Sequence, residues 1–363
     1  MTVTIGRREL LAALGGATAA WPLAAARAAG GDAGAAYRGH HERIGTEHPM
    51  TEASPVPLSR RTTSGAAAAG AALATATFSG TSSMRAQTRS KGTFVLVHPA
   101  WFGGWCWKKV APLLRERGYD VYTPTLTGLG DRAHLARPEI GLNIHIEDVA
   151  NLLKSEDLAG VILVGNSSGG MVITGVADQA PELIAHIVYL DAFVPQDGQS
   201  MLDIMPPDGR PPMEALVRNE GQGWLLPRLA PPPWEKFVPE AWRITDEADL
   251  RWILPRLCPT PFGHFKEPVH RRNAAAEKLP RTYIRCVQWP NAVFDRYAEA
   301  ARQTPGWRYR ELATSHIPYI THPNQLADLL IVAGDAPMQT QLTGPARCAM
   351  DRPLTAKTGV RVP

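Results

Sequence analysis

The chain has 363 residues, of which 44% are apolar and 20% are charged, and its formal net charge is +4. This length allows one large domain or two small ones with a sizeable buried core, and the composition is that of a soluble globular protein. Part of the arginine excess lies in residues 1–90, and no basic run is interleaved with aromatic residues, so we expect no nucleic-acid partner.

Residues 1–28 resemble a twin-arginine export signal. Arg7-Arg8 precede a weakly apolar Ala/Leu/Gly stretch that ends in Ala26-Arg27-Ala28, a typical cleavage pattern. The stretch is too short and too weakly apolar for a membrane span, which needs about 20 apolar residues. We therefore expect export to the periplasm or the medium, transient binding to the twin-arginine export machinery and no stable membrane span. If the signal is not functional, the protein stays cytoplasmic.

The same pattern occurs a second time. Arg60-Arg61 precede an Ala/Gly-rich stretch, and Ser83-Met84-Arg85-Ala86 is a second candidate cleavage site. Two export signals in series make little mechanistic sense, so we expect translation to start at Met50 rather than at Met1. The alternative is a disordered Ala/Gly/Ser linker. In either case residues 1–90 lie outside the predicted fold.

Beyond this segment, apolar runs typical of buried parallel strands alternate with stretches of helical periodicity. Such alternation predicts an α/β fold, in which a mostly parallel sheet is covered by helices on both faces. The predicted strands are Thr93–His98, Tyr119–Pro124, Val161–Val164, Ile184–Leu190, Thr282–Val287 and Trp307–Leu312, and the predicted helices are Trp105–Arg117, Ile144–Ser155, Gly169–Gln179 and Asn324–Val332.

The alternation breaks between about residues 195 and 280, where Pro and Trp are dense. An insertion of this size between two strands of a sheet predicts a cap or lid over the strand ends. We therefore expect one domain over residues 91–335 that includes this cap. Residues 336–363 lose all periodicity and are expected to form a polar tail.

Gly165-Asn-Ser-Ser-Gly169 lies directly between a predicted buried strand and a predicted helix. The pattern G-x-S-x-G in this context is that of a nucleophile elbow, a strained turn that exposes a serine hydroxyl above the carboxyl edge of a sheet. The start of the helix adds positive potential. Ser167 is therefore the expected nucleophile. Ser168 is a weaker alternative, since Asn166 would then occupy the position that needs a small residue.

A serine hydroxyl needs a base to accept its proton. In the fold that carries this elbow, the chain order is Ser, acid, His, and the His follows the last strand. His316 lies just after the last predicted strand and just before the closing helix. We therefore expect His316 to be the base.

The acid that orients this histidine has two candidates. After the predicted strand that ends at Val287, the natural position holds Asn291, which carries no charge, and Asp295 follows at an apparent helix start, where an N-cap role is the plain alternative. Asp191 directly follows the strand that ends at Leu190. We favour Asp191 as the acid and keep Asp295 as the alternative; Asp191 could instead be a structural carboxylate that accepts hydrogen bonds from backbone amides.

An oxyanion hole needs two N–H groups aimed at the developing negative oxygen. The residue after the nucleophile, Ser168, would supply one backbone amide. The second is expected from the loop after the first strand. Pro99 has no N–H, so Ala100 is the expected donor and Trp101 the next candidate.

No other motif indicates a cofactor or a metal. Gly128-Leu-Gly-Asp-Arg-Ala133 matches a dinucleotide-binding pattern only superficially, because it does not follow the first strand of the predicted fold. No HExxH, Walker or EF-hand spacing is present. The four cysteines, Cys106, Cys258, Cys286 and Cys348, form no CxxC pair, and we expect free structural thiols, with a disulfide as the alternative.

Three segments together resemble a known group of proteins: Phe94–His98 with Gly104–Trp107, the elbow Val164–Gly170, and Asp191-Ala-Phe-Val-Pro195. Over about residues 92–333 the chain is similar to small α/β-hydrolases, in particular to the plant methylesterase and hydroxynitrile lyase family and to bacterial esterases like the pyrethroid hydrolases. The resemblance implies an α/β-hydrolase fold and a serine hydrolase that needs no cofactor.

The chain departs from these relatives at several positions. They usually have His at the position of Asn166, a larger residue at Ser168 and often Gly at Pro99, and their acid falls near Asn291. Hydroxynitrile lyases of the family also use a Lys near the acid, and no Lys lies close to Asn291 or Asp295.

The leading hypothesis for the function is hydrolysis of a small, hydrophobic carboxylic ester through an acyl-enzyme, because the Trp- and Pro-rich cap indicates an apolar pocket. The alternatives are a C–C lyase of the hydroxynitrile lyase kind and a ligand-binding protein without turnover.

Overall fold

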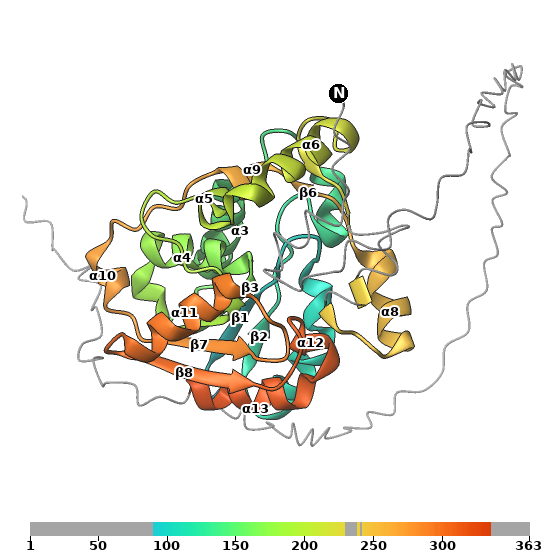
Figure 1. Cartoon of the computed structure of the whole chain (residues 1–363). Helices are drawn as coiled ribbons and strands as arrows, with labels where there is room; N and C mark the ends of the chain where they lie inside the picture. The colour runs from blue at the N-terminus through green and yellow to red at the C-terminus, as the bar shows by residue number, and fades with distance from the viewer. Residues whose placement is uncertain (1–89, 229–237, 240–241, 335–363) are drawn as a thin grey trace, which may run out of the picture. The chain divides into compact units, whose positions relative to one another are not determined.

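The computed structural model describes residues 90–228, 238–239 and 242–334. Within them, six strands form one sheet in the order β2-β1-β3-β4-β7-β8, and each neighbouring pair is parallel (Figure 1). The predicted α/β fold with a mostly parallel sheet is confirmed. The predicted export signals, the start at Met50 and the polar tail fall on residues outside the described part of the chain.

The elements have these bounds. The main sheet consists of β1 (Thr93–Val97), β2 (Asp120–Tyr122), β3 (Val161–Ser167), β4 (Ile184–Ala192), β7 (Arg281–Cys286) and β8 (Trp307–Leu312), and an antiparallel pair consists of β5 (Leu225–Leu226) and β6 (Thr260–Pro261). The α-helices are α2 (Ala111–Glu116), α3 (Leu142–Ser155), α4 (Gly169–Gln179), α5 (Met201–Ile204), α6 (Arg210–Glu220), α8 (Glu247–Ile253), α9 (Gly263–Lys266), α10 (Ala274–Glu277), α11 (Ala292–Gln303), α12 (Pro318–Thr321) and α13 (Pro323–Gly334). The 3₁₀ helices are η1 (Gly104–Lys109), η2 (Gly130–Leu135), η3 (Pro181–Leu183), η4 (Pro207–Gly209) and η5 (Leu254–Arg256).

The core lies on both faces of the main sheet. β1, β3 and β4 are almost completely buried, as expected of parallel strands with helices on either side. In Figure 1, α4 and α11 lie on one face of the sheet, with α3 packed against α4. On the other face α13 packs against α2. The consequence is a rigid platform whose strand ends can carry functional side chains.

One predicted helix is divided in two. The sequence predicted a continuous helix over Trp105–Arg117, but η1 ends at Lys109 and α2 begins at Ala111. Pro112 lies in the first turn of α2. Because proline has no N–H and its ring clashes with the preceding turn, a helix can begin at this position but cannot run through it. Apolar spacing alone does not reveal this break.

Two strands extend further than predicted. β3 continues from Val164 to Ser167, and β4 continues from Leu190 to Ala192. The two strands are parallel neighbours, so their extended ends meet at the same edge of the sheet. As a result the expected nucleophile and the preferred acid are both strand-end residues.

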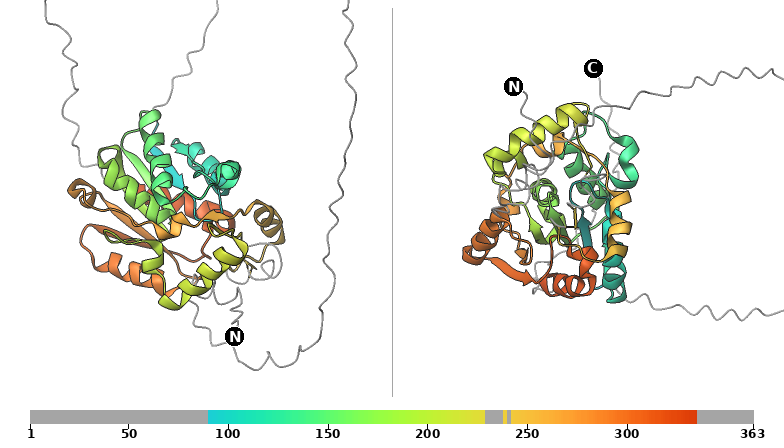
Figure 2. Two further views of the ribbon diagram at one scale, coloured as in Figure 1. Left: turned by 90° about the horizontal axis from the view of Figure 1, so that it is seen from above. Right: turned by 45° about the vertical axis from the view of Figure 1, so that its right-hand side comes forward.

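The chain between β4 and β7 contributes five short helices, α5, α6, α8, α9 and α10, and the β5–β6 pair to the described residues. In Figure 1 and in the right-hand view of Figure 2, α6 and α13 lie on opposite sides of the described region. Among all the described residues, no helix combines the length and the apolar character that crossing a membrane requires.

Buried histidines predict a loss of stability in acid. Burial lowers the pKa of His98, His145 and His186 from 6.5 to about 4 in each case. The unfolded chain therefore binds more protons than the folded chain between pH 6.5 and pH 4. We expect the free energy of unfolding to be highest above pH 6.5 and to fall through this window, by at most about 3 kcal/mol for each histidine.

Urea unfolding at a series of pH values measures this effect. His186 Nε2 is hydrogen-bonded to Thr282 Oγ1 at 2.8 Å. It lies near the start of β4, away from the carboxyl end of the strand that carries Asp191. In His186→Gln we expect a slope of stability against pH that is shallower than in the unmodified chain. Equal slopes for the two proteins would contradict the prediction.

Candidate active site

Ser167 lies in a turn that only small neighbours permit. Its φ of 53° is in the left-handed region that L-residues rarely adopt. A Cβ atom on Gly165 would lie 2.7 Å from the carbonyl oxygen of Gly169, and a Cβ on Gly170 would lie 2.1 Å from the carbonyl oxygen of Phe193. Strand β3 and helix α4 can therefore approach closely enough to form the sharp turn. This arrangement is that of the predicted nucleophile elbow.

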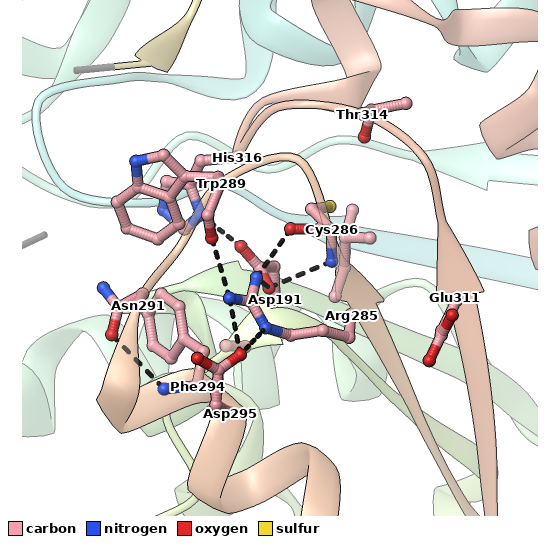
Figure 3. Close-up of polar contacts among 12 residues, drawn as sticks. Asp191, Arg285, Cys286, Trp289, Asn291, Phe294, Asp295, Glu311, Thr314 and His316 are labelled. Carbon is pink, nitrogen blue, oxygen red and sulfur yellow. Dashed lines mark hydrogen bonds and ion pairs between the residues drawn. The ribbon is translucent and has the colours of Figure 1, made fainter. Parts of the chain in front are cut away.

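His316 lies between β8 and α12, and the structure brings it against Asp191. Its Nδ1 donates a hydrogen bond to Asp191 Oδ2 at 2.7 Å, and both side chains are buried (Figure 3). A carboxylate on Nδ1 leaves Nε2 as the nitrogen that can accept a proton. The preferred acid and the predicted base are thus paired, although 125 positions separate them in sequence.

A bulge at the end of β4 directs Asp191. In the register between β3 and β4, Asn166 pairs with Leu190 and Ser167 pairs with Ala192, so Asp191 is the extra residue. Its φ is 43°, again in the left-handed region. Bulges of this kind re-aim a side chain and occur next to active sites. Such strain persists only where several contacts enforce it, and Asp191 has them.

The second oxygen of Asp191 is held by β7. Arg285 Nη1 donates to Asp191 Oδ1 at 2.7 Å, and the backbone N–H of Cys286 donates to the same oxygen at 3.1 Å (Figure 3). Asp191 is fully buried and the Arg285 side chain is 3% exposed. A buried carboxylate needs such compensation, because removing it from water is strongly unfavourable.

Arg285 was not singled out in the sequence, yet it links several parts of the site. Besides Asp191 it donates to the carbonyl oxygens of Cys286 at 2.6 Å and of Trp289 at 2.7 Å, and to Asp295 Oδ1 at 2.9 Å through Nε. The available signal in the sequence was a charged residue in the middle of the predicted strand Thr282–Val287, whose other residues are mostly apolar. Carboxylates beside it raise the pKa of its guanidinium and outweigh the effect of burial, so Arg285 stays charged.

The alternative acid, Asp295, does not contact His316. Its side chain is 61% exposed and pairs with Arg285. The helix start near it is also different from the expectation. Asn291, and not Asp295, is the N-cap of α11, and its side chain accepts hydrogen bonds from the backbone N–H groups of Val293 and Phe294. The uncharged residue at the usual acid position therefore has a structural role.

Aromatic rings enclose the imidazole of His316. The ring of Trp289 is stacked on it with a centroid distance of 3.9 Å, and that of Phe294 lies at 5.4 Å with an interplanar angle of 16°. Asn166, directly before Ser167, donates from its Nδ2 to the backbone carbonyl oxygens of Leu190 and His316. The two rings limit the orientations that the imidazole can adopt, and Asn166 ties the backbone of His316 to β4.

Both candidate amides of the loop after β1 have hydroxyl partners. The N–H of Ala100 donates to Ser168 Oγ at 2.8 Å, and the N–H of Trp101 donates to Thr260 Oγ1 at 2.8 Å. The predicted pair Ala100 and Ser168 is therefore in contact, but through the Ser168 side chain.

The remaining sequence motifs lie outside this cluster. Gly128 has a φ of 82° and belongs to the turn before η2. Cys106, Cys258 and Cys286 are free thiols, and Cys348 lies outside the described residues. Among the described residues, no three His, Cys, Asp or Glu side chains gather as they would around a metal ion.

Comparison with known proteins places the chain in a family. Residues 94–329 match the model of the alpha/beta hydrolase family. The carbendazim hydrolyzing esterase of Nocardioides sp. (strain SG-4G) is 37% identical over 245 residues, which are 66% of this chain and 99% of that protein. The pyrethroid hydrolase of Sphingobium wenxiniae is 29% identical over 293 residues, 73% of this chain and 95% of that protein.

Solved structures of α/β-hydrolases have the same fold as this chain. An extracellular alpha/beta-hydrolase from a Paenibacillus species superimposes with a TM-score of 0.58 at 25% identity, covering 68% of this chain and all of that one. The expected resemblance is confirmed, and the named relatives are carboxylic-ester hydrolases. The chain belongs to the alpha/beta hydrolase family.

Proposed function

We propose that this enzyme hydrolyses small, hydrophobic carboxylic esters with Ser167 as nucleophile, His316 as base and Asp191 as the acid that orients it. The observation that carries the proposal is the 2.7 Å hydrogen bond between His316 and Asp191 at the sheet edge where the Ser167 elbow also ends. This combination provides the three roles that nucleophilic acyl transfer needs.

The proposed reaction has two halves. His316 Nε2 takes the proton of the Ser167 hydroxyl while Ser167 Oγ attacks the acyl carbon, and the alcohol then leaves with the proton from His316. In the second half a water molecule gives its proton to Nε2 and attacks the acyl-enzyme, which releases the acid and restores Ser167. Asp191 stays ionised throughout, holds the imidazole in one tautomer and stabilises its charged form.

Aromatic side chains support a hydrophobic substrate. Phe102, in the loop after β1, contacts the rings of Trp105, Trp242 and Tyr319, and Trp242 comes from the segment between β4 and β7. Two relatives are named for the hydrolysis of small organic molecules, one for carbendazim and one for pyrethroids. We propose a substrate of the same general kind.

A panel of p-nitrophenyl esters of increasing chain length, assayed with the unmodified enzyme and with Ser167→Ala, tests the function. We expect turnover by the unmodified enzyme and a loss of about 10⁶-fold in kcat for Ser167→Ala, the usual effect of removing such a nucleophile. A fluorophosphonate probe should label Ser167 in the unmodified enzyme only. Well-folded protein that is neither labelled nor active would instead favour a ligand-binding role, and cleavage of a cyanohydrin without ester hydrolysis would favour the lyase.

A further inference from the structure

The Ser168 hydroxyl lies at the position where the resemblance leads one to expect a larger side chain. It accepts the N–H of Ala100 at 2.8 Å, and Ser168 and Ala100 are both buried. This hydroxyl follows the proposed nucleophile by one residue. It therefore belongs to the region where the negative oxygen of the tetrahedral intermediate must be held.

The first two candidate donors in the loop after β1, the amides of Ala100 and Trp101, are already engaged in this arrangement. Pro99 has no N–H, the Ala100 N–H is bonded to Ser168 Oγ, and the Trp101 N–H is bonded to the fully buried hydroxyl of Thr260. An oxyanion hole built from the Ser168 amide and the Ala100 amide would require the Ser168 side chain to give up this bond.

The Ser168 hydroxyl itself has a proton to donate. A serine hydroxyl provides one donor and two acceptor sites, and here one acceptor site receives the Ala100 N–H. Within the described residues, neither the hydroxyl proton nor the backbone N–H of Ser168 has an acceptor. The two donors belong to one residue and are separated by only Cα and Cβ, so they can converge on one oxygen.

We propose that the oxyanion hole of this enzyme consists of the backbone N–H and the side-chain O–H of Ser168, with the Ala100 amide behind the hydroxyl. The proposal rests on the ester hydrolysis proposed above. A hydroxyl that accepts a hydrogen bond becomes a better donor, so the Ala100 N–H strengthens the bond from Ser168 to the negative oxygen. Ser168 is the N-cap of the 11-residue helix α4, whose dipole also favours negative charge here. The hydroxyl keeps its proton, and no covalent bond to Ser168 forms.

Ser168→Ala separates this arrangement from the usual one. If the hydroxyl is a donor to the oxyanion, its removal should lower kcat about 10²- to 10³-fold and change KM little, because the bond is made mainly in the transition state. If the Ala100 amide is the true donor and the hydroxyl only blocks it, Ser168→Ala should keep or raise kcat, and this result would overturn the proposal.

Thr174→Val is the matched control. Thr174 also carries a buried hydroxyl on α4, bonded to the carbonyl oxygen of Gly170 at 2.7 Å and to the Tyr189 hydroxyl at 2.9 Å. Its loss should lower the melting temperature but leave kcat within a few-fold. Circular dichroism of both variants checks that each is folded.

An inhibitor gives an independent measurement. A trifluoromethyl ketone forms a tetrahedral adduct with a nucleophilic serine and so places an oxyanion in the hole. Its inhibition constant should rise in Ser168→Ala by about the factor by which kcat falls, and an unchanged inhibition constant would contradict the proposal. The two proposals fail differently: ester turnover that is abolished in Ser167→Ala but intact in Ser168→Ala refutes only the role of the Ser168 hydroxyl, whereas an unmodified enzyme without turnover or labelling refutes the function.

Discussion

Asp191→Asn is expected to lower kcat by about 10⁴-fold with little change in KM. An asparagine at this position can present an amide N–H to His316 Nδ1, which favours the tautomer that has its proton on Nε2. The imidazole then cannot accept the proton of Ser167, and its charged form loses the carboxylate that stabilises it. Steady-state kinetics with a p-nitrophenyl ester measure the effect, and circular dichroism checks that the variant is folded.

Asp295→Asn is the matched control, because it makes the same chemical change in the alternative acid. Asp295 is largely exposed and bonds to Arg285 rather than to His316, so we expect its kcat to fall by less than about 10-fold. A large loss in Asp295→Asn together with full activity in Asp191→Asn would reverse the assignment of the acid.

Arg285→Met is expected to lower the free energy of unfolding by about 3–5 kcal/mol, the usual effect of removing one partner of a buried ion pair. Asp191 would remain buried with its charge uncompensated on Oδ1 except for the Cys286 N–H. The carbonyl oxygens of Cys286 and Trp289 would also lose the hydrogen bonds from Arg285. We expect kcat to fall as well, since both Asp191 and the Trp289 ring orient His316. Urea unfolding and ester turnover measure the two effects.

Two further variants sharpen this test. Arg310→Met removes an exposed arginine from the neighbouring strand β8 and should change the free energy of unfolding by less than about 0.5 kcal/mol. In the double variant Asp191→Asn with Arg285→Met the buried charge is gone, so the two losses should be much smaller together than their sum. If Arg285→Met is no less stable than Arg310→Met, Arg285 does not support Asp191.

Local patterns determined much of the fold and two residues of the proposed triad. The predicted helix over Gly169–Gln179 and the predicted strand over Trp307–Leu312 match α4 and β8, because apolar runs and periodicity depend on residues that are close in sequence. Ser167 and His316 could be proposed for the same reason. An elbow is encoded in five consecutive residues, and the histidine follows the last strand.

The sequence only favoured Asp191 over Asp295, and the tertiary structure shows which of the two carboxylates bonds to His316. The decision depends on the order β3-β4-β7 in the sheet and on a bulge that directs Asp191 towards His316, and neither is encoded in the residues next to Asp191. The link from Arg285 to Asp191 joins two strands that are 94 positions apart, and the bond from Ala100 to Ser168 Oγ joins two loops 68 positions apart. Contacts of this range follow from how strands and helices pack, and periodicity and motif spacing contain no information about them. The sequence therefore predicted a nucleophile and a base, and tertiary packing decided which carboxylate bonds to His316 and which hydroxyl accepts the Ala100 N–H.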